Sequence, residues 1–296
     1  MLMLEGKNEN KAKLKMLSAM ALFGTIGIFV RYIELPSSII ALARGFIGTI
    51  FLLLLVQLQG RGVDRTAVKA NFKLLCISGA CVGFNWILLF EAYRYTTVAT
   101  ATLSYYMAPV FVMLASPFVV GERLSALKGF CVAMALGGMV LVSGVVQGGS
   151  EGVTITGILY GFGAAGLYAI VVLLNKFIHN IDGYALTIMQ LGTAAIVLLP
   201  YTLVTENFSA MSMDTASLLL LAFVGIVHTG FNYSLYFSSL QELQAQTAAL
   251  LSYIDPVVAI VLSTVLLGEQ MDWLSGLGAV MVLGSTLLQE LWGRRM

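Results

Sequence analysis

Asp255 is an acidic residue inside a long apolar run, in the sequence Leu251-Ser252-Tyr253-Ile254-Asp255-Pro256. An acid near the centre of a membrane-spanning helix costs about 2.5–3.5 kcal/mol on insertion scales, so such residues usually have a function. The carboxyl group could bind a proton, a cation or the ammonium group of a substrate. The alternative is a structural role, for instance pairing with Arg44 in another apolar run. Arg44 could itself bind a substrate carboxylate, but the structural ion pair is the favoured interpretation.

Polar side chains at helical spacing form a second group of candidates. His228, Asn232 and Tyr236 follow one another at intervals of four residues, so they share one face of a helix. Asn85, with Trp86 beside it, stands 147 residues before Asn232. These residues could contact a substrate, and His228 could also exchange protons. The alternative is hydrogen bonding between helices, worth about 0.6 kcal/mol on average, and it is favoured for either asparagine taken alone.

Two tyrosines stand three residues before two prolines, and the pairs are Tyr106 with Pro109 and Tyr253 with Pro256. Each proline removes one helical N–H and thereby frees the carbonyl group four residues earlier. The prolines could act as hinges or only as static kinks. The tyrosines could stack on a planar substrate or hold an ammonium group by cation–π contact, and ordinary packing is the alternative.

Enzyme motifs are missing from the sequence. It contains neither H-E-x-x-H nor G-x-S-x-G, and a single histidine in an apolar run cannot assemble a metal cluster. The segment 161–166 matches G-x-G-x-x-G, but no strand precedes it, so a dinucleotide site is not indicated. We therefore expect no catalytic residue, no metal and no cofactor. Without a nucleotide site, ATP-driven transport within this chain is excluded. No basic stretch indicates nucleic-acid binding.

Membrane helices are the elements that must position these residues. Of the 296 residues, 59% are hydrophobic and only 10% are charged, with a mean hydropathy of +0.91. Soluble domains carry about 25% charged residues. A helix needs about 20 apolar residues to cross the hydrocarbon core. Ten ranges meet this requirement: 14–33, 38–59, 72–92, 97–119, 125–146, 154–178, 184–204, 216–238, 244–267 and 273–292.

Lys and Arg residues set the expected orientation. With the N-terminus inside, thirteen of the sixteen lie in inner segments, two lie in outer segments and Arg44 lies within a span. This distribution favours ten spans with both termini in the cytoplasm of a multi-pass plasma-membrane protein. The expected organisation is an N-terminal tail (1–13), a first five-helix unit (14–150), a second unit (151–292) and a C-terminal tail (293–296).

An offset of 147 residues aligns the two units without a gap from the third to the fifth span. Gly83-Phe84-Asn85-Trp86 then meets Gly230-Phe231-Asn232-Tyr233, and Gly121-Glu122 meets Gly268-Glu269. Because each unit has an odd number of spans, the second copy must enter the membrane from the opposite side. The sequence therefore predicts an all-α fold of two inverted five-helix repeats, as in many transporters. Glycines at helical spacing, Gly79/Gly83 and Gly157/Gly161, predict close helix packing.

The chain resembles the drug/metabolite transporter superfamily, specifically its EamA-type members with ten helices. The matching features are Ala43-Arg44-Gly45-Phe46, the segment 92–97, the two prolines within spans and the two Gly-Glu pairs. The resemblance implies a central cavity lined largely by spans 1, 3, 4, 6, 8 and 9. Members of this family carry amino acids, sugars, nucleotide-linked metabolites or drugs, and export is the expected direction.

The residues and the resemblance together predict a secondary active transporter of a small organic metabolite. An acid, an arginine and several aromatic residues around one cavity would suit an amino acid or a similar zwitterion. Nucleobases, organic cations or drugs fit the same residues, and a channel or an intramembrane enzyme is the alternative of another class. The expected partners are a small-molecule substrate and the lipid bilayer, and the sequence leaves a homodimer open.

Overall fold

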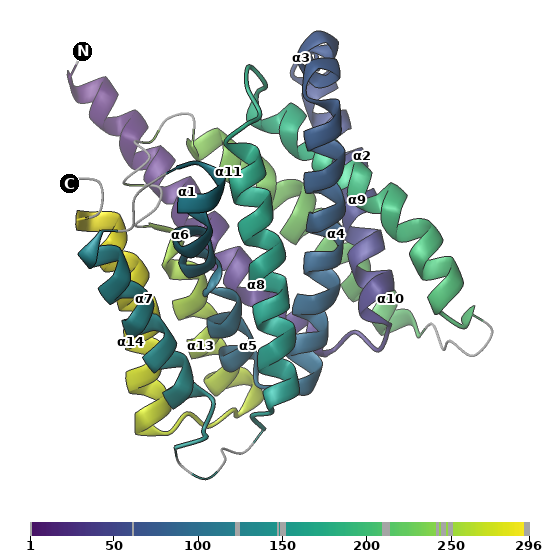
Figure 1. Cartoon of the computed structure of the whole chain (residues 1–296). Helices are drawn as coiled ribbons and strands as arrows, with labels where there is room; N and C mark the ends of the chain where they lie inside the picture. Colours follow the sequence, from purple (N-terminus) through teal and green to yellow (C-terminus); the bar gives the residue numbers. More distant parts are fainter. Residues whose placement is uncertain are drawn as a thin grey trace.

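The computed structural model describes residues 2–60, 62–121, 125–146, 148, 152–208, 214–240, 243, 247 and 251–292. In this part of the chain every regular element is a helix (Figure 1). The expected C-terminal tail, Glu122 and most of residues 244–250 lie outside the described residues. The helices are α1 (Leu2–Arg31), α2 (Ser37–Leu58), α3 (Arg65–Ala70), α4 (Phe72–Tyr95), α5 (Val98–Tyr105), α6 (Ala108–Val119), α7 (Ala126–Val142), α8 (Ile155–Asn175), α9 (Gly183–Thr205), α10 (Thr215–Phe223), the π-helix η2 (Val224–Phe231), α11 (Asn232–Leu240), α13 (Ile254–Leu267) and α14 (Trp273–Trp292).

Seven helical segments of the described chain are long and apolar enough to cross a membrane. Three further apolar helices are shorter, with 10–17 residues each. All ten segments overlap the ranges expected from the sequence, but the count of ten spans remains a prediction. The helix α1 begins at Leu2, so the segment expected as a tail continues the first helix. The long segments are Asn10–Arg31, Ser37–Leu58, Phe72–Tyr95, Val98–Val119, Ile155–Asn175, Gly183–Thr205 and Thr215–Ser239, and the short ones are Ala126–Val142, Ile254–Leu267 and Trp273–Gln289.

Side-chain caps and glycines mark several helix ends. The Asp182 carboxylate accepts hydrogen bonds from the first backbone N–H groups of α9, and Thr154 caps α8 in the same way. Asp214 caps α10, and hydrogen bonds from the side chain and backbone of Ser217 lower the pKa of its carboxyl group. Gly268 ends α13 with a φ of 66°, a conformation that glycine adopts without a steric cost.

Two of the expected continuous spans are broken. The range 97–119 divides into α5 and α6 at Tyr106 and Met107, and α13 follows a turn at Tyr253. Both interruptions lie two or three residues before a proline, where the helical N–H is missing. The amide of Met107 bonds instead to the carbonyl of Ser104, a tighter turn of the 3₁₀ type.

The expected eighth span contains the π-helix η2 between α10 and α11. The hydroxyl of Thr229 donates to the carbonyl of Val224, five residues earlier, at 3.2 Å. A π-helical segment holds extra residues per turn, so it rotates the residues before it relative to those after it. His228, Asn232 and Tyr236 nevertheless all contact α1, at Thr25, the Ala19 carbonyl and the Phe23 ring, so the stripe expected from their spacing faces one helix.

The two halves of the chain interleave. Each of the most extensive helix contacts joins a helix of the first half to one of the second. α4 packs along α8 and α9, while η2 and α11 pack along α2 and α1, which are the equivalent contacts after the halves are exchanged. α5 and α6 contact α8, and the equivalent contact after the halves are exchanged joins α13 to α1. Two further pairs, α2–α9 and α7–α14, also join the halves (Figure 1). The first turns of α1 and the last turns of α14 lie at the same end of the bundle.

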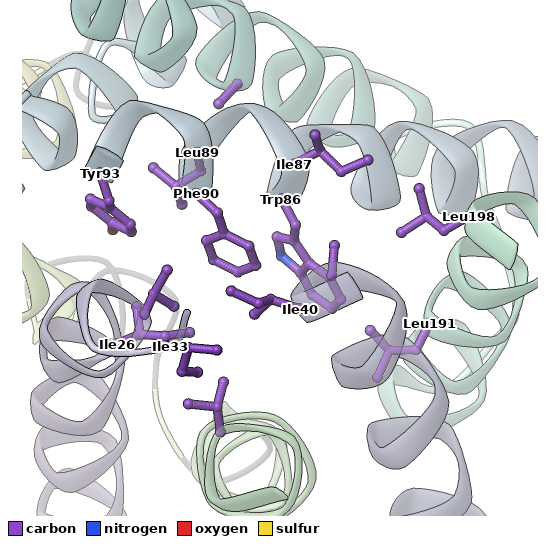
Figure 2. Packing of buried hydrophobic residues seen from close by; sticks show 14 of the residues in the cluster. Ile26, Ile33, Ile40, Trp86, Ile87, Leu89, Phe90, Tyr93, Leu191 and Leu198 are labelled. Carbon is purple, nitrogen blue, oxygen red and sulfur yellow. The ribbon is translucent and has the colours of Figure 1, made fainter. Parts of the chain in front are cut away.

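The largest buried apolar cluster lies between α1, α2, α4 and α9 (Figure 2). Phe90 and Ile40 are completely buried in it, and the indole ring of Trp86 is nearly so. Glycines allow close helix contacts around this core, as the sequence predicted. A Cβ atom on Gly157 would lie 2.5 Å from Thr96, and one on Gly79 would lie 2.7 Å from the Gln190 carbonyl oxygen.

Candidate functional site

A cavity of about 480 Å³ lies between the two halves of the bundle. Its volume is in the range typical of small-molecule sites, about 300–1,000 Å³. Its wall contains residues of the expected first, third, fourth, sixth, eighth and ninth spans, as the resemblance implies. The wall also contains residues of α2 and α9, two spans that the resemblance does not place there: Arg44, Leu186, Thr187, Gln190 and Leu191.

The predicted site residues divide into two groups. Asn85, Trp86, Tyr106, Tyr236 and Asp255 line the cavity, and so do Arg44 and Pro109. The remaining four candidates do not line it: His228, Asn232, Tyr253 and Pro256.

Asp255 lies in the first turn of α13 and faces Tyr106 across the cavity wall. The phenol hydroxyl of Tyr106 lies 3.0 Å from Oδ2 of Asp255 and 3.2 Å from the carbonyl oxygen of Ser252. This carbonyl is the one that Pro256 leaves without its helical N–H donor. The side chain at one helix break thus contacts the freed carbonyl at the equivalent break of the other half.

Arg44 is 3% exposed, and its guanidinium group lies over the Trp86 ring at 4.2 Å from the ring centre. Its Nε donates to the hydroxyl of Thr229 at 3.0 Å, and Phe90 lies on the same side at 5.3 Å. Among the described residues, its terminal nitrogens have no hydrogen-bond partner. The aromatic rings hold the guanidinium group by cation–π contact, and Arg44 is part of the cavity wall.

Arg44 and Asp255 do not form the ion pair that the sequence suggested. Asp255 contacts Tyr106, and Arg44 contacts Trp86 and Thr229, so each charge has neutral neighbours. The two ion pairs given by the described residues, Arg31 with Glu269 and Arg94 with Glu91, involve neither of them. Both charged groups therefore line one cavity without a counter-ion from the described residues.

Aromatic rings make up much of the remaining wall. Tyr105 and Tyr168 pack at 5.6 Å, and Tyr105 packs edge-on to Tyr106 at 6.4 Å. On the other half, Tyr233 and Tyr236 both pack edge-on against Phe23 of α1. The cavity thus offers flat π surfaces and phenol hydroxyls around its two charges.

The two equivalent asparagines make equivalent hydrogen bonds between the halves. The amide nitrogen of Asn85 donates to the carbonyl of Ala164 at 2.6 Å, and that of Asn232 donates to the carbonyl of Ala19 at 3.0 Å. Each bond joins the third helix of one repeat to the first helix of the other. This arrangement gives both residues a structural role, and Asn85 contributes to the cavity wall as well.

His228 is completely buried, between α1 and η2 rather than in the cavity. Its Nε2 lies 2.7 Å from the hydroxyl of Thr25, whose single proton is donated to the carbonyl of Leu22. The rings of Phe29 and Phe223 lie 5.0 and 5.4 Å from the His228 ring, so His228 is part of the aromatic packing of the bundle.

Gln190 on α9 was not among the site residues predicted from the sequence. The amide nitrogen of Gln190 donates to the hydroxyl of Ser78 at 3.0 Å and to the side-chain oxygen of Asn175 at 2.9 Å. Gln190 and Asn175 both line the cavity, as does Tyr168. A polar side chain within each apolar run was the available signal, but spacing alone did not show that these helices meet.

Glu269 lies away from the cavity and acts as a helix cap. Its carboxylate accepts hydrogen bonds from the amides of Val98 at 2.9 Å and Ala99 at 3.4 Å, so it caps α5 rather than α14. Arg31 lies 3.8 Å from this carboxylate and donates to the carbonyls of Tyr93 and Thr96 at the end of α4. These contacts fasten α1, α4, α5 and the end of α13 together.

Comparison with known proteins identifies relatives along nearly the whole chain. The model of the EamA-like transporter family matches twice, at residues 10–144 and 155–289. An uncharacterized transporter of Bacillus subtilis (strain 168), YxxF, is 32% identical over 96% of this chain and 91% of its own length. The pseudopaline exporter CntI of Pseudomonas aeruginosa (strain UCBPP-PA14) is 26% identical over 56% of each chain.

The fold also has a counterpart among solved structures. One crystal structure superposes with a TM-score of 0.66, at 19% sequence identity, and covers 96% of this chain and 99% of the other. Three findings agree: the family model matches twice, the relatives are transporters, and seven helical segments are long and apolar enough to cross a membrane. The chain belongs to the EamA-like transporter family: it is a multi-pass membrane transporter, not an enzyme, and it carries two copies of the family's domain.

Proposed function

We propose that this protein is a secondary active transporter that exports a small amphoteric organic molecule by alternating access. Amino acids and similar zwitterions are the favoured substrates. The observation that carries the proposal is the placement of Arg44 and Asp255 in one cavity without an ion pair between them.

Electrostatics favours an amphoteric substrate. A charge removed from water costs several kcal/mol unless a partner compensates it. Arg44 and Asp255 have only neutral partners among the described residues. A molecule with a carboxylate and an ammonium group would supply both missing counter-charges at once. A substrate of a single charge would leave one of the two groups without a partner.

The aromatic wall is consistent with an ammonium group near Asp255. Tyr106 contacts the carboxylate, and Tyr105 and Tyr168 continue the same wall. Tyrosine faces attract ammonium groups by about 0.5–2 kcal/mol, depending on desolvation. The terminal nitrogens of Arg44, which have no hydrogen-bond partner among the described residues, match the two oxygens of a carboxylate.

Alternating access follows from the arrangement of the repeats. We propose ten spans in the plasma membrane, with both termini in the cytoplasm and the two five-helix units in opposite orientations. Exchanging the halves reproduces the main helix contacts, so the same packing can be adopted with the cavity open to the other side. Asp255 is the proposed coupling site, where a proton and the substrate ammonium group compete for one carboxylate. Export is proposed because one relative is a named exporter.

An organic cation is the second candidate substrate. Asp255 with its neighbouring tyrosines would bind a cation without any help from Arg44. The two candidates therefore differ in whether Arg44 contributes to affinity.

A panel of ligands separates these substrates. Purified protein is tested for thermal stabilisation by amino acids, nucleobases, sugars and organic cations, because a ligand of the native state raises the melting temperature. For a zwitterion, Asp255→Asn and Arg44→Gln each lower the affinity about tenfold or more, the effect of losing one hydrogen-bonded charge. For an organic cation, only Asp255→Asn does so. Glu34→Gln and Arg65→Gln are the controls, because they remove one exposed charge of each sign.

Transport in liposomes then tests the mechanism. A transporter that alternates between two states exchanges labelled for unlabelled substrate across the membrane, and it passes no continuous current. A sustained substrate-independent conductance in planar bilayers would contradict alternating access. Stabilisation by neither amino acids nor cations would contradict the proposed substrate class.

A further inference from the structure

Two amide side chains form a neutral polar part of the cavity wall. Gln190 of α9 and Asn175, the last residue of α8, both line the cavity. The amide nitrogen of Gln190 donates to the side-chain oxygen of Asn175 at 2.9 Å and to the hydroxyl of Ser78 at 3.0 Å. Gln190 is 8% exposed, so these bonds fix a nearly buried amide group at the edge of the cavity.

Each of the two amides keeps one polar atom that bonds to no other described residue. Gln190 keeps its side-chain oxygen, which is an acceptor, and Asn175 keeps its amide nitrogen, which is a donor. Neither atom is among the fully enclosed polar atoms that lack a partner, so both are accessible at the cavity that they line. Turning both amide groups over exchanges the two positions, and the pair again offers one donor and one acceptor.

This amide pair lies beside Arg44. α2 packs along α9, and a Cβ atom on Gly45 would lie 3.2 Å from the carbonyl oxygen of Leu191. Gly45 and Leu191 directly follow Arg44 and Gln190 in the chain, and both Arg44 and Gln190 line the cavity. In the proposed function, Arg44 binds the carboxylate of the substrate, so the side chain of the same substrate can reach the amide pair.

We propose that Gln190 and Asn175 form a side-chain subsite that selects zwitterions bearing a neutral carboxamide, the class to which glutamine and asparagine belong. This inference rests on the proposed function and names the substrate within it. A carboxamide carries both an acceptor and a donor, so it pairs with both free atoms at once. An apolar side chain would leave both atoms without a partner, and a site built to hydrogen-bond a polar group rejects an analogue that lacks it.

The charges of the cavity favour a neutral side chain over an ionised one. Arg44 and Asp255 are the charged residues of the described cavity wall, and the carboxylate and ammonium groups of the substrate use both of them. A third charge on the substrate would enter the cavity without a counter-charge, at a cost that the neutral amide pair does not offset.

Two amino acids of similar length test the subsite. Glutamine carries the carboxamide, whereas norleucine has an unbranched apolar side chain. The affinity of each is measured from the thermal stabilisation of the purified full-length protein. We expect the wild type to prefer glutamine by about tenfold or more, because glutamine makes two neutral hydrogen bonds that norleucine cannot make.

Gln190→Met replaces the amide group with an apolar chain of similar length. The ratio of the glutamine affinity to the norleucine affinity should fall about three- to tenfold, the factor for one neutral hydrogen bond. Asn175→Ala should lower the ratio by a similar factor, and it tests the subsite independently because it lies at the end of another helix. Damage to the fold would weaken both ligands together and would leave the ratio as it is.

Two control variants separate recognition from helix packing. Ser78→Ala removes the bond between α4 and α9 but leaves both free amide atoms in place, and Ser78 does not line the cavity. This variant should lower the melting temperature and keep the affinity ratio. Gln57→Met removes an exposed carboxamide outside the cavity and should match the wild type in both measurements.

The outcomes distinguish the subsite from the proposed function. The subsite is wrong, and the zwitterion transporter stands, if the wild type binds amino acids without preferring glutamine to norleucine. The same holds if Gln190→Met or Asn175→Ala keeps the wild-type ratio, or if Ser78→Ala lowers the ratio as far as Gln190→Met does. If no amino acid stabilises the wild type, the proposed function is wrong and the subsite falls with it.

Discussion

At the scale of residues, this protein uses its buried polar groups in two distinct ways. Asn85 and Asn232 join the halves through bonds to backbone carbonyls, and His228 bonds to Thr25 within the packed bundle. Arg44 and Asp255, in contrast, leave part of their bonding capacity toward the cavity. Residue type alone does not separate the two uses, because all of these side chains lie within apolar runs.

The asparagine bonds predict a difference between stability and binding. Asn232→Ala should lower the free energy of unfolding by about 0.6–1.7 kcal/mol, the measured range for hydrogen bonds between membrane helices, and should leave substrate affinity unchanged. Asn85→Ala should cost a similar amount and also lower affinity, because Asn85 lines the cavity. Unfolding in detergent and ligand titration measure the two effects. Ser234→Ala is the control, because its hydroxyl bonds to the Phe231 carbonyl three residues earlier and not to the other half of the chain. A loss of affinity in Asn232→Ala would contradict the assignment.

At the scale of elements, close packing on α1 fixes the position of Asp255, the proposed coupling residue. A Cβ atom added to Gly24 would lie 2.5 Å from the carbonyl oxygen of Asp255 and 2.8 Å from the Cβ of Val258. Neither contact can be relieved by rotating a flexible side chain, because one atom is backbone and the other is the first atom of its side chain. α1 and α13 would have to move apart, and Asp255 would move relative to Tyr106.

Gly24→Ala is therefore expected to lower stability and to slow transport, despite the usual gain of about 0.5–1 kcal/mol for Gly→Ala within a helix. Gly166→Ala is the matched control, since its new methyl group meets no atom within 4 Å and should raise stability by that amount. Unfolding free energies and exchange rates of the two variants provide the comparison. Equal behaviour of the two variants would show that α1 and α13 do not need this close approach.

At the scale of the whole molecule, the two interleaved halves form one mechanical unit rather than two separate domains. Each half obtains its main packing partners from the other, so neither half alone buries its apolar helix faces. A motion of one half must therefore exchange contacts with the other half throughout the bundle. This coupling suits a transporter whose two states are related by exchanging the roles of the halves.

The proposed inverted arrangement of ten spans predicts which loops are accessible from each side. Single cysteines are introduced into a variant without Cys76, Cys81 and Cys131, and intact cells are labelled with a membrane-impermeant thiol reagent. Positions 34 and 214 should react in intact cells, and positions 64 and 180 should react only after lysis. Labelling of position 64 from outside would contradict the proposed orientation. Labelling of positions 34 and 214 on opposite sides would contradict the proposed number of spans.

Much of the fold and part of the site could be predicted from the sequence. Long apolar runs, glycine and proline breakers and the offset of 147 residues predicted an all-helical chain with two repeats. They also pointed to Asp255, Tyr106, Asn85 and Trp86, which the structure brings to one cavity wall. The stripe of His228, Asn232 and Tyr236 faces α1, as its spacing predicted, but only Tyr236 also lines the cavity. Gln190 and Tyr168 were missed, because nothing in their own helices shows which neighbour they face.

The sequence by itself determined the class of this protein, its repeat and its family, because hydropathy and internal similarity are properties of the chain that do not depend on how helices are oriented. Only the tertiary structure decided that Arg44 contacts Trp86 rather than Asp255, that Glu269 caps α5, and that Tyr106 reaches both Asp255 and Ser252. These contacts depend on the rotation and depth of each helix in the bundle. A single break or π-turn changes both, and packing against the other half of the chain fixes them.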